Sequence, residues 1–170
     1  MKRYILILFL LLNGFAFAQK KSNKEQIQQV MKDFFAGIKE KDSAKFYSTF
    51  HDVPVTWVGV YKDKSYEKIQ HQNHKMKPYF SDSYGEFFKS ISGKKTVEEK
   101  YDNVKIIEDG NVASINFDYS FWYDNKMLNW GKEIWTMVKV YGNWKITSVI
   151  FSMEMTEYYP QPSLKERLKK

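Results

Sequence analysis

The chain has 170 residues, a formal net charge of +7 at neutral pH and no cysteine. This length suits one domain with a substantial core, and the lack of cysteine excludes disulfides and a lipid-modified N-terminal cysteine. The basic residues are spread over several short lysine clusters instead of one stripe, which argues against a nucleic-acid-binding protein. Aromatic residues make up 18% of the chain, which indicates a core of large rings or an aromatic pocket.

The first 18 residues have the pattern of a secretory signal peptide. Residues 2–3 form a positive n-region, an uncharged apolar run covers residues 4–12, and Ala16 and Ala18 supply the small residues that a signal peptidase reads. The apolar run is too short to span a bilayer, and an uncleaved membrane anchor is the alternative. We therefore expect cleavage after Ala18, a periplasmic or secreted protein, and no stable membrane anchor.

Helical periodicity dominates the chain after this segment. Ser22 and Glu25 have the spacing of a capping box, and apolar residues follow at helical intervals up to Ile38. Asp42 is placed to cap a short second helix, and the β-branched run after Pro54 predicts a first strand. Two further helices are expected, over residues 65–76 and 84–91.

From Lys94 onward the apolar period changes from helical to alternating. Tight turns rich in glycine, asparagine and aspartate separate the segments, so the strands are expected to form an antiparallel meander. The expected strands cover residues 96–107, 112–123, 127–141 and 143–155. Helices followed by long strands predict an α+β domain over residues 19–159, with the helices packed on the concave face of a curved sheet. A basic tail, residues 160–170, follows.

Alternation along the strands predicts which side chains face the core. In the third long strand, Ile134 and Thr136 are expected to face inward and Glu133 outward; Asp118 is also expected outward, and Glu154 inward. The last strand is apolar on both faces, which is typical of a strand that is covered on both sides or lies in an interface. We therefore expect a homodimer that forms through the convex face of the sheet.

A family resemblance rests on the order of the elements. A helix, a short helix, the segment "FHDVPVTWVGV" and a meander that ends in "YGNWKITSVIFS" resemble SnoaL-like and related domains of the nuclear transport factor 2-like (NTF2-like) superfamily. The resemblance covers about residues 26–152 and implies a cystatin-like cone. The same fold serves isomerases, dehydratases, cyclases, protein-association modules and ligand binders, so the resemblance leaves the function open.

The resemblance also implies positions for the acid/base residues of ketosteroid-isomerase-like members. An alignment without gaps places the tyrosine position at Phe34, the base at Val58 and the second acid at Thr136. None of these side chains can perform the required proton transfers or donate to an oxyanion as an acid, so ketosteroid-isomerase chemistry is not expected.

Other polar residues offer alternative chemistry. His51 is a candidate general base near the mouth of the cone, and an inward-facing Glu154 is a candidate acid or base; both could instead simply face water. Glu67, His71 and His74 are metal-ligand types at helical spacing, but a fourth ligand is not evident. We therefore expect no metal and no cofactor.

The residues expected to line a ligand pocket combine rings with small polar groups. They are Phe34, Trp57, Val58, Tyr119, Trp130, Thr136 and Ser148. Such a pocket would suit a small hydrophobic or aromatic molecule, and a plain core is the alternative. We expect an exported domain that binds such a molecule; the alternatives are an isomerase, dehydratase or cyclase, and a dimeric protein-interaction module. No nucleic-acid partner is expected.

Overall fold

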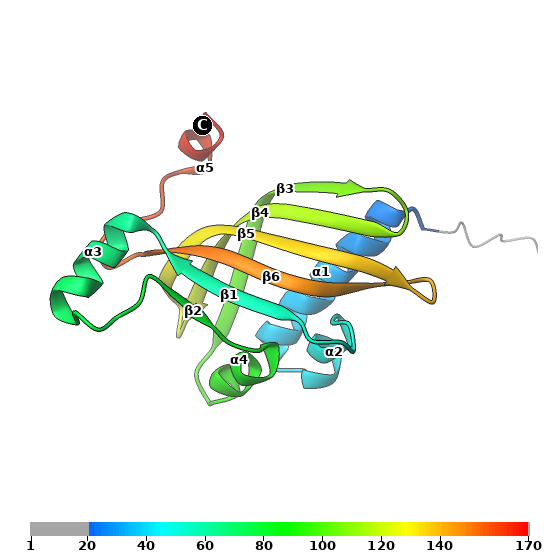
Figure 1. Cartoon of the computed structure of the whole chain (residues 1–170), viewed down its shortest axis with the longest axis horizontal. Coiled ribbons are helices and arrows are strands. Elements are labelled where there is room, and N and C mark those ends of the chain that lie inside the picture. Colours follow the sequence, from blue (N-terminus) through cyan, green and yellow to red (C-terminus); the bar gives the residue numbers. More distant parts are fainter. Residues whose placement is uncertain (1–20, 170) are drawn as a thin grey trace, which may run out of the picture.

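The computed structural model describes residues 21–169, so the expected signal peptide lies outside the described residues. Within this range no helix has the length and apolar character needed to cross a membrane. The helices are α1 (Asn23–Glu40), α2 (Ser43–Ser48), α3 (Asp63–Gln72), α4 (Tyr84–Ile91) and α5 (Leu164–Arg167). The strands are β1 (Thr56–Tyr61), β2 (Tyr79–Ser81), β3 (Val97–Glu108), β4 (Val112–Tyr123), β5 (Lys126–Val140) and β6 (Asn143–Met155) (Figure 1).

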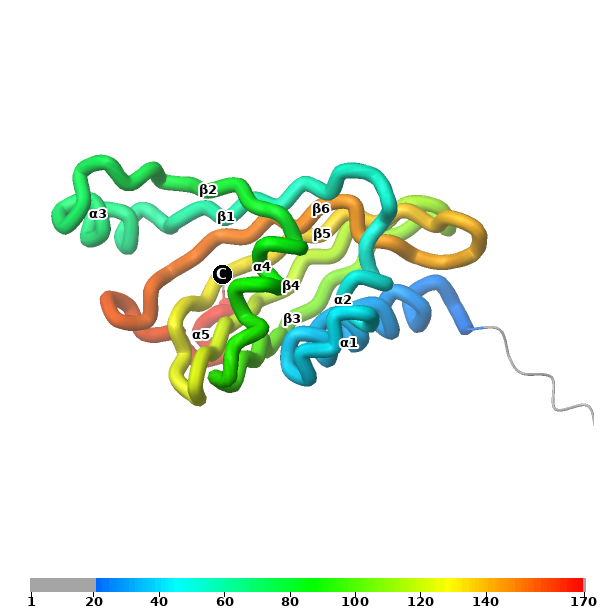
Figure 2. The backbone as a smooth tube through the Cα atoms, turned by 90° about the horizontal axis from the view of Figure 1, so that it is seen from below, coloured from blue at the N-terminus to red at the C-terminus, as the bar shows by residue number. Residues whose placement is uncertain are grey.

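The strands form one six-stranded sheet in the order β2-β1-β6-β5-β4-β3. The expected antiparallel meander from β3 to β6 is confirmed, whereas the parallel pairing of β1 with β6 and the short strand β2 were not predicted. Helices α1, α2 and α4 lie along one face of the curved sheet (Figure 2). The α+β architecture expected from the sequence is therefore present, and the sheet remains open at β2 and β3.

The N-terminal helix begins and ends as its sequence predicts. Ser22 and Glu25 form the expected capping box, which satisfies backbone N–H groups that have no partner inside the helix. Lys41 adopts a left-handed conformation at the other end, and Asp42 caps α2 by accepting a hydrogen bond from the backbone of Lys45. These two caps define the tight turn between α1 and α2, which lie side by side.

A cluster of aromatic rings joins α1 and α2 to the sheet. Trp135 is fully buried, and its ring centroid lies 4.6 Å from that of Phe34 and 5.2 Å from that of Phe117. Phe34 also contacts Phe46, with a centroid separation of 5.0 Å. Rings of this size dominate the burial of apolar surface, so this end of the cone is a filled core. Phe34 was expected to line a pocket and instead belongs to that core.

The orientation predicted for β5 was wrong. Glu133, Trp135 and Met137 are buried on the concave face, whereas Ile134 and Thr136 face the convex side. Both alternating sets of this strand contain apolar residues, so the period of two does not tell which set is buried. The large Trp135 ring fills the core, and the alternation then brings Glu133 to the same face.

A β-bulge corrects the prediction for β6. The pairing with β5 shifts between Thr136 and Met137, where two residues of β6 are passed for one of β5. The inward set therefore changes along β6, from Trp144 and Ile146 to Val149, Phe151 and Met153. This switch explains why the strand is apolar on both faces, and it places Glu154 on the face away from the helices that line the cone.

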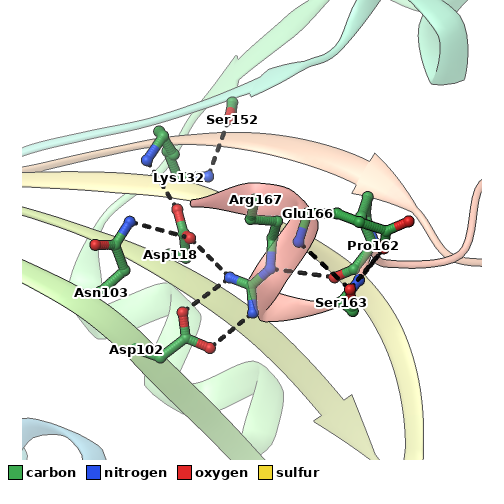
Figure 3. A network of polar contacts seen from close by, with 9 residues as sticks. All are labelled: Asp102, Asn103, Asp118, Lys132, Ser152, Pro162, Ser163, Glu166 and Arg167. Carbon is green, nitrogen blue, oxygen red and sulfur yellow. Dashed lines mark hydrogen bonds and ion pairs between the residues drawn. The ribbon is translucent and has the colours of Figure 1, made fainter. Parts of the chain in front are cut away.

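The C-terminal tail is fastened to the convex face of the sheet. Ser163 and Glu166 form a second capping box, which starts α5. Arg167 donates two hydrogen bonds of 2.8 Å to the carboxylate of Asp102 and one of 2.7 Å to Asp118 (Figure 3). Lys132 donates to the other oxygen of Asp118 at 2.8 Å. We refer to Asp102, Asp118, Lys132 and Arg167 as the convex network.

Candidate functional site

A cavity of about 320 Å³ opens on the concave face between α4 and the strands. Its walls are mostly rings. Trp57 from β1 stacks on Phe87 from α4 at 5.1 Å, and Phe151 from β6 meets Trp57 edge to face at 6.2 Å. The other lining residues are Phe80, Asp82, Ser90, Ile91, Glu99, Tyr119, Phe121, Tyr123, Asn129, Glu133 and Met153.

Two buried carboxyl groups lie in the wall of this cavity. Glu99 projects from β3 and Glu133 from β5, on either side of β4, and their exposed fractions are 8% and 3%. The indole Nε1 of Trp135 donates a hydrogen bond to Glu133. Among residues 21–169, no backbone or side-chain donor reaches the buried Oε1 atom of Glu99. We refer to Glu99 and Glu133 as the carboxyl pair.

The carboxyl pair is arranged to hold a proton near neutral pH. Burial, the nearby charge of Glu133 and a hydrogen bond with Glu133 raise the pKa of Glu99 well above its usual range. Burial also raises the pKa of Glu133 to about 7, although the hydrogen bonds from Trp135 and Glu99 favour its charged form. Two carboxyl groups in contact cannot both ionise cheaply at a site of low polarity. Because only Glu133 accepts from the indole, Glu133 ionises first and Glu99 keeps the proton.

Tyr119 lies on β4 between the two strands that carry the pair. Its hydroxyl donates a hydrogen bond of 3.1 Å to the carbonyl oxygen of Ser152. Burial, followed by the charges of Glu133 and Glu99, raises the pKa of Tyr119 well above its usual range, so the phenol stays neutral. Gly131 faces the same Ser152 carbonyl, and a Cβ atom there would clash with it. The glycine therefore lets β5 and β6 approach closely beneath Tyr119.

Only part of the predicted pocket is brought together. Trp57 and Tyr119 line the cavity. Val58 and Thr136 were expected inward but lie on the other face of the sheet, where the Thr136 hydroxyl is 2.7 Å from that of Ser148. Trp130 also lies outside the cavity, and its Nε1 donates to the carbonyl oxygen of Tyr159 at 2.9 Å.

The two catalytic candidates from the sequence lie apart from the cavity and from each other. His51 precedes β1, and its Nδ1 accepts a hydrogen bond of 3.0 Å from the backbone of Val53. Glu154 accepts a hydrogen bond of 2.5 Å from Ser65, and Ser65 in turn accepts one from the backbone of Met155. Glu154 therefore holds α3 against the end of β6, and the prediction that it faces the cone was wrong.

The candidate metal ligands do not assemble. His71 is exposed in the last turn of α3. The helix stops at Gln72, so His74 lies beyond its end. Within residues 21–169, no three histidine or acidic side chains are grouped closely enough to hold a metal ion.

The carboxyl pair was missed, yet the sequence carries a signal for it. Glu133 shares its alternation with Trp135 and Met137, and Glu99 shares its alternation with Val97. Residues two apart in a strand share a face, so a carboxylate that alternates with large apolar residues is buried whenever they are. β5 has Trp130 on one alternation and Trp135 on the other, and only the choice of Trp135 as the inward ring identifies Glu133 as buried.

Comparisons with solved structures identify the fold. An NTF2-like protein from Cytophaga hutchinsonii superposes with a TM-score of 0.58 at 12% identity, over 79% of this chain and all (100%) of that chain. An NTF2-like protein of unknown function from Shewanella baltica gives 0.54 at 16% identity, over 83% and 98% of the two chains. A protein provisionally described as a scytalone dehydratase, from Novosphingobium aromaticivorans, gives 0.56 at 14% identity, over 78% and 84%.

The chain therefore has an NTF2-like, cystatin-like α+β fold, as the sequence resemblance implied. At these identities the likeness defines the fold and leaves the activity open. No family model matches the sequence, and no curated protein is similar to it.

Proposed function

We propose that this chain binds a small, largely apolar or aromatic molecule in the concave cavity. The observation that carries the proposal is the cavity itself, which has walls mostly of aromatic rings and includes the buried carboxyl pair among its polar groups. Its volume of about 320 Å³ is at the lower end of the range of ligand pockets, and mostly apolar walls with few polar groups are typical of them. Its ligand would be a single-ring molecule or one of similar size.

Tryptophan fluorescence tests this proposal, because Trp57 is part of the wall. Titration with a panel of single-ring compounds should change the emission of the wild type. The change should be lost or strongly reduced in Trp57→Phe and kept in Trp130→Phe, whose ring lies on the convex side. Equal responses of the two variants, or no response to any compound together with no co-purified mass in native mass spectrometry, would contradict binding in this cavity.

We also propose that the protein acts after export and removal of residues 1–18. This rests on the charge pattern and the apolar run at the N-terminus. N-terminal sequencing of protein from an exporting host should begin at Gln19. A chain that retains Met1 in the membrane fraction would support the anchor instead.

A second candidate function is proton-transfer catalysis in the same cavity. The carboxyl pair favours it, because a group that titrates at about 7 can both take up and release a proton at neutral pH. Two of the solved structures with this fold, including the Novosphingobium protein, are provisionally described as dehydratases. Under this proposal, turnover in a panel of dehydration and isomerisation substrates should follow a pH profile that is lost in Glu133→Gln. A profile that is unchanged in that variant would exclude the pair as the acid and base.

We further propose a homodimer through the convex face. Val58, Ile150 and Ile134 lie side by side across β1, β6 and β5, and the two isoleucines are each 42% exposed. A row of apolar side chains across three strands is a surface that a second copy can cover. Sedimentation of the wild type should show a dimer that Ile134→Lys disrupts, and a wild-type monomer at micromolar concentration would contradict the proposal.

A further inference from the structure

The charge of the cavity is opposite to the charge of the chain. The chain has 27 lysines and arginines against 20 acidic residues. Three acidic side chains line the cavity, Asp82, Glu99 and Glu133, and its lining residues within 21–169 include no lysine, arginine or histidine. A bound ligand would therefore meet acidic side chains with no basic side chain among the lining residues to neutralise them. Such a cavity disfavours an anion and stabilises a cation.

The aromatic walls of the cavity also favour a cation. Trp57 and Phe87 stack with an interplanar angle of 30°, and Phe121 and Phe151 add two further rings to the wall. The face of an aromatic ring carries partial negative charge, so a cation that lies over several rings is attracted by each of them. The attraction is strongest where water is excluded, and Trp57 is only 5% exposed.

Glu99 adds a hydrogen-bond acceptor that the protein does not satisfy. Its side chain is more than nine-tenths buried, it lines the cavity, and its Oε1 atom receives no donor from the described residues. An unpaired acceptor at such depth carries a desolvation cost that a donor on a ligand would remove. An N–H group fits this requirement, and a charged N–H group also fits the electrostatics of the walls.

We propose that the ligand of this cavity is a protonated amine with a small apolar or aromatic body, such as an arylalkyl ammonium ion. The proposal rests on the proposed function that the cavity binds a small molecule. The ammonium group would lie at the carboxyl pair, with its N–H groups directed to Glu99 and Glu133, and the apolar body would lie against the wall formed by Trp57, Phe87 and Phe151.

Binding of a cation also has a consequence for the shared proton. Without a ligand, Glu99 is protonated because the two carboxyl groups cannot both ionise at low cost. An ammonium ion beside them supplies the missing positive charge, so the pair releases its proton when the ligand binds. The other titratable groups around the pair are Tyr119 and Tyr123 from β4 and Asp82 between β2 and α4. Tyr119 stays neutral, so the released proton comes from the pair.

Three probes of similar size and different charge test the proposal. Phenethylammonium, phenethyl alcohol and phenylacetate share a benzyl group and differ in the terminal group. Titration of the full chain, followed by tryptophan fluorescence and calorimetry, should show that the ammonium ion binds at least about tenfold more tightly than the alcohol. Phenylacetate should show no binding. Calorimetry in two buffers of different ionisation enthalpy should detect proton release with the ammonium ion only.

Matched variants test whether the preference for the ammonium ion comes from the carboxyl pair. Glu133→Gln removes the charge but keeps the shape and the acceptor for Trp135, so the preference for the ammonium ion over the alcohol should disappear. Glu98→Gln is the control, because Glu98 is the neighbour of Glu99 on β3 and pairs with Lys39 outside the cavity. It should keep the full preference. Glu99→Gln provides a second route to the same result if Glu133→Gln does not fold.

The outcomes separate this inference from the proposed function. If the alcohol binds as tightly as the ammonium ion, the cavity binds apolar molecules without regard to charge, and only the present inference is overturned. If phenylacetate binds best, the inference is again overturned. If none of the three probes binds and the wider single-ring panel also fails, both the inference and the proposed binding function are overturned.

Discussion

Two buried carboxylates on neighbouring strands of this sheet have opposite surroundings. Asp118 on β4 and Glu133 on β5 are 5% and 3% exposed, respectively. Asp118 belongs to the convex network, where Lys132 and Arg167 both donate hydrogen bonds to it. Glu133 faces the concave cavity, where its partners are an indole N–H and a second carboxyl group.

The comparison shows that partners, and not burial, decide what a buried carboxylate does. Burial opposes ionisation of Asp118, but the hydrogen bond and charge of Lys132 and the charge of Arg167 outweigh it and lower the pKa of Asp118. At Glu133 no cation offsets burial, and the pKa rises. Asp118 is therefore a structural anion that fixes the tail. Glu133 is a group whose charge is available to a ligand or a reaction.

Removal of Arg167 should give the largest effect. Arg167→Ala leaves Asp102 and the buried Asp118 without their shared guanidinium partner, and we expect a loss of about 3 kcal/mol in the free energy of unfolding. Denaturant unfolding measures this loss. Lys165→Ala, at an exposed position of the same helix, is the control and should change stability little. Equal effects of the two substitutions would show that the convex network does not stabilise the fold.

The same chemical change should have opposite effects at the two carboxylates. Asp118→Asn removes a charge that two cations stabilise and should lower the free energy of unfolding by about 2 kcal/mol at about pH 8. Glu133→Gln removes a charge that no cation stabilises and should raise it by about 1 to 2 kcal/mol at that pH. Chemical denaturation of both variants measures the two free energies of unfolding. Destabilisation of similar size in both would contradict opposite roles for the two carboxylates.

The pH dependence of stability should carry the signature of the carboxyl pair. Both carboxyl groups have a folded pKa above the unfolded value, which is 4.5. The folded state therefore holds more protons than the unfolded state between about 4.5 and 7, so stability falls as the pH rises through this range. The slope should approach about 1.4 kcal/mol per pH unit for each group. Glu133→Gln should flatten it, and a slope of the opposite sign would contradict the shared proton.

Lys132 should contribute least. Its side chain is 57% exposed, and Arg167 remains beside Asp118 when it is removed. We expect Lys132→Met to cost about 0.5 kcal/mol or less, with a smaller cost at high salt because exposed pairs are screened. Thermal unfolding at low and high salt measures this difference. A cost as large as that of Arg167→Ala would mean that Lys132 is the main partner of Asp118.

Local signals in the sequence predicted most of the fold. The capping box of α1, the cap at Asp42 and the glycine and asparagine turns act within a few residues, so the helices and the meander could be placed from the chain alone. The contacts that could not be predicted join distant parts of the chain. Arg167 is 65 residues from Asp102, and β1 pairs with β6 although four other strands lie between them in the sequence.

The candidate site was harder to predict, because it depends on which face of each strand is buried. Trp57 and Tyr119 were placed in the pocket, but an alignment without gaps pointed to Val58, and β5 was assigned with Ile134 inward instead of Trp135. A register error of one residue moves every side chain to the other face. That error assigned Glu133 to the outer face. The bulge in β6 likewise reverses the face of Glu154, which was expected inward.

Carbon-13 NMR of the glutamate side-chain carboxyl groups tests directly whether Glu99 and Glu133 share a proton. Signals of Glu99 and Glu133 can be assigned from Glu99→Gln and Glu133→Gln, and their chemical shifts followed with pH. We expect Glu133 to titrate at about 7, with Glu99 still protonated at that pH. Titration of both groups at the ordinary value of about 4.5 would show that the cavity holds two independent carboxylates, and the shared proton would be contradicted.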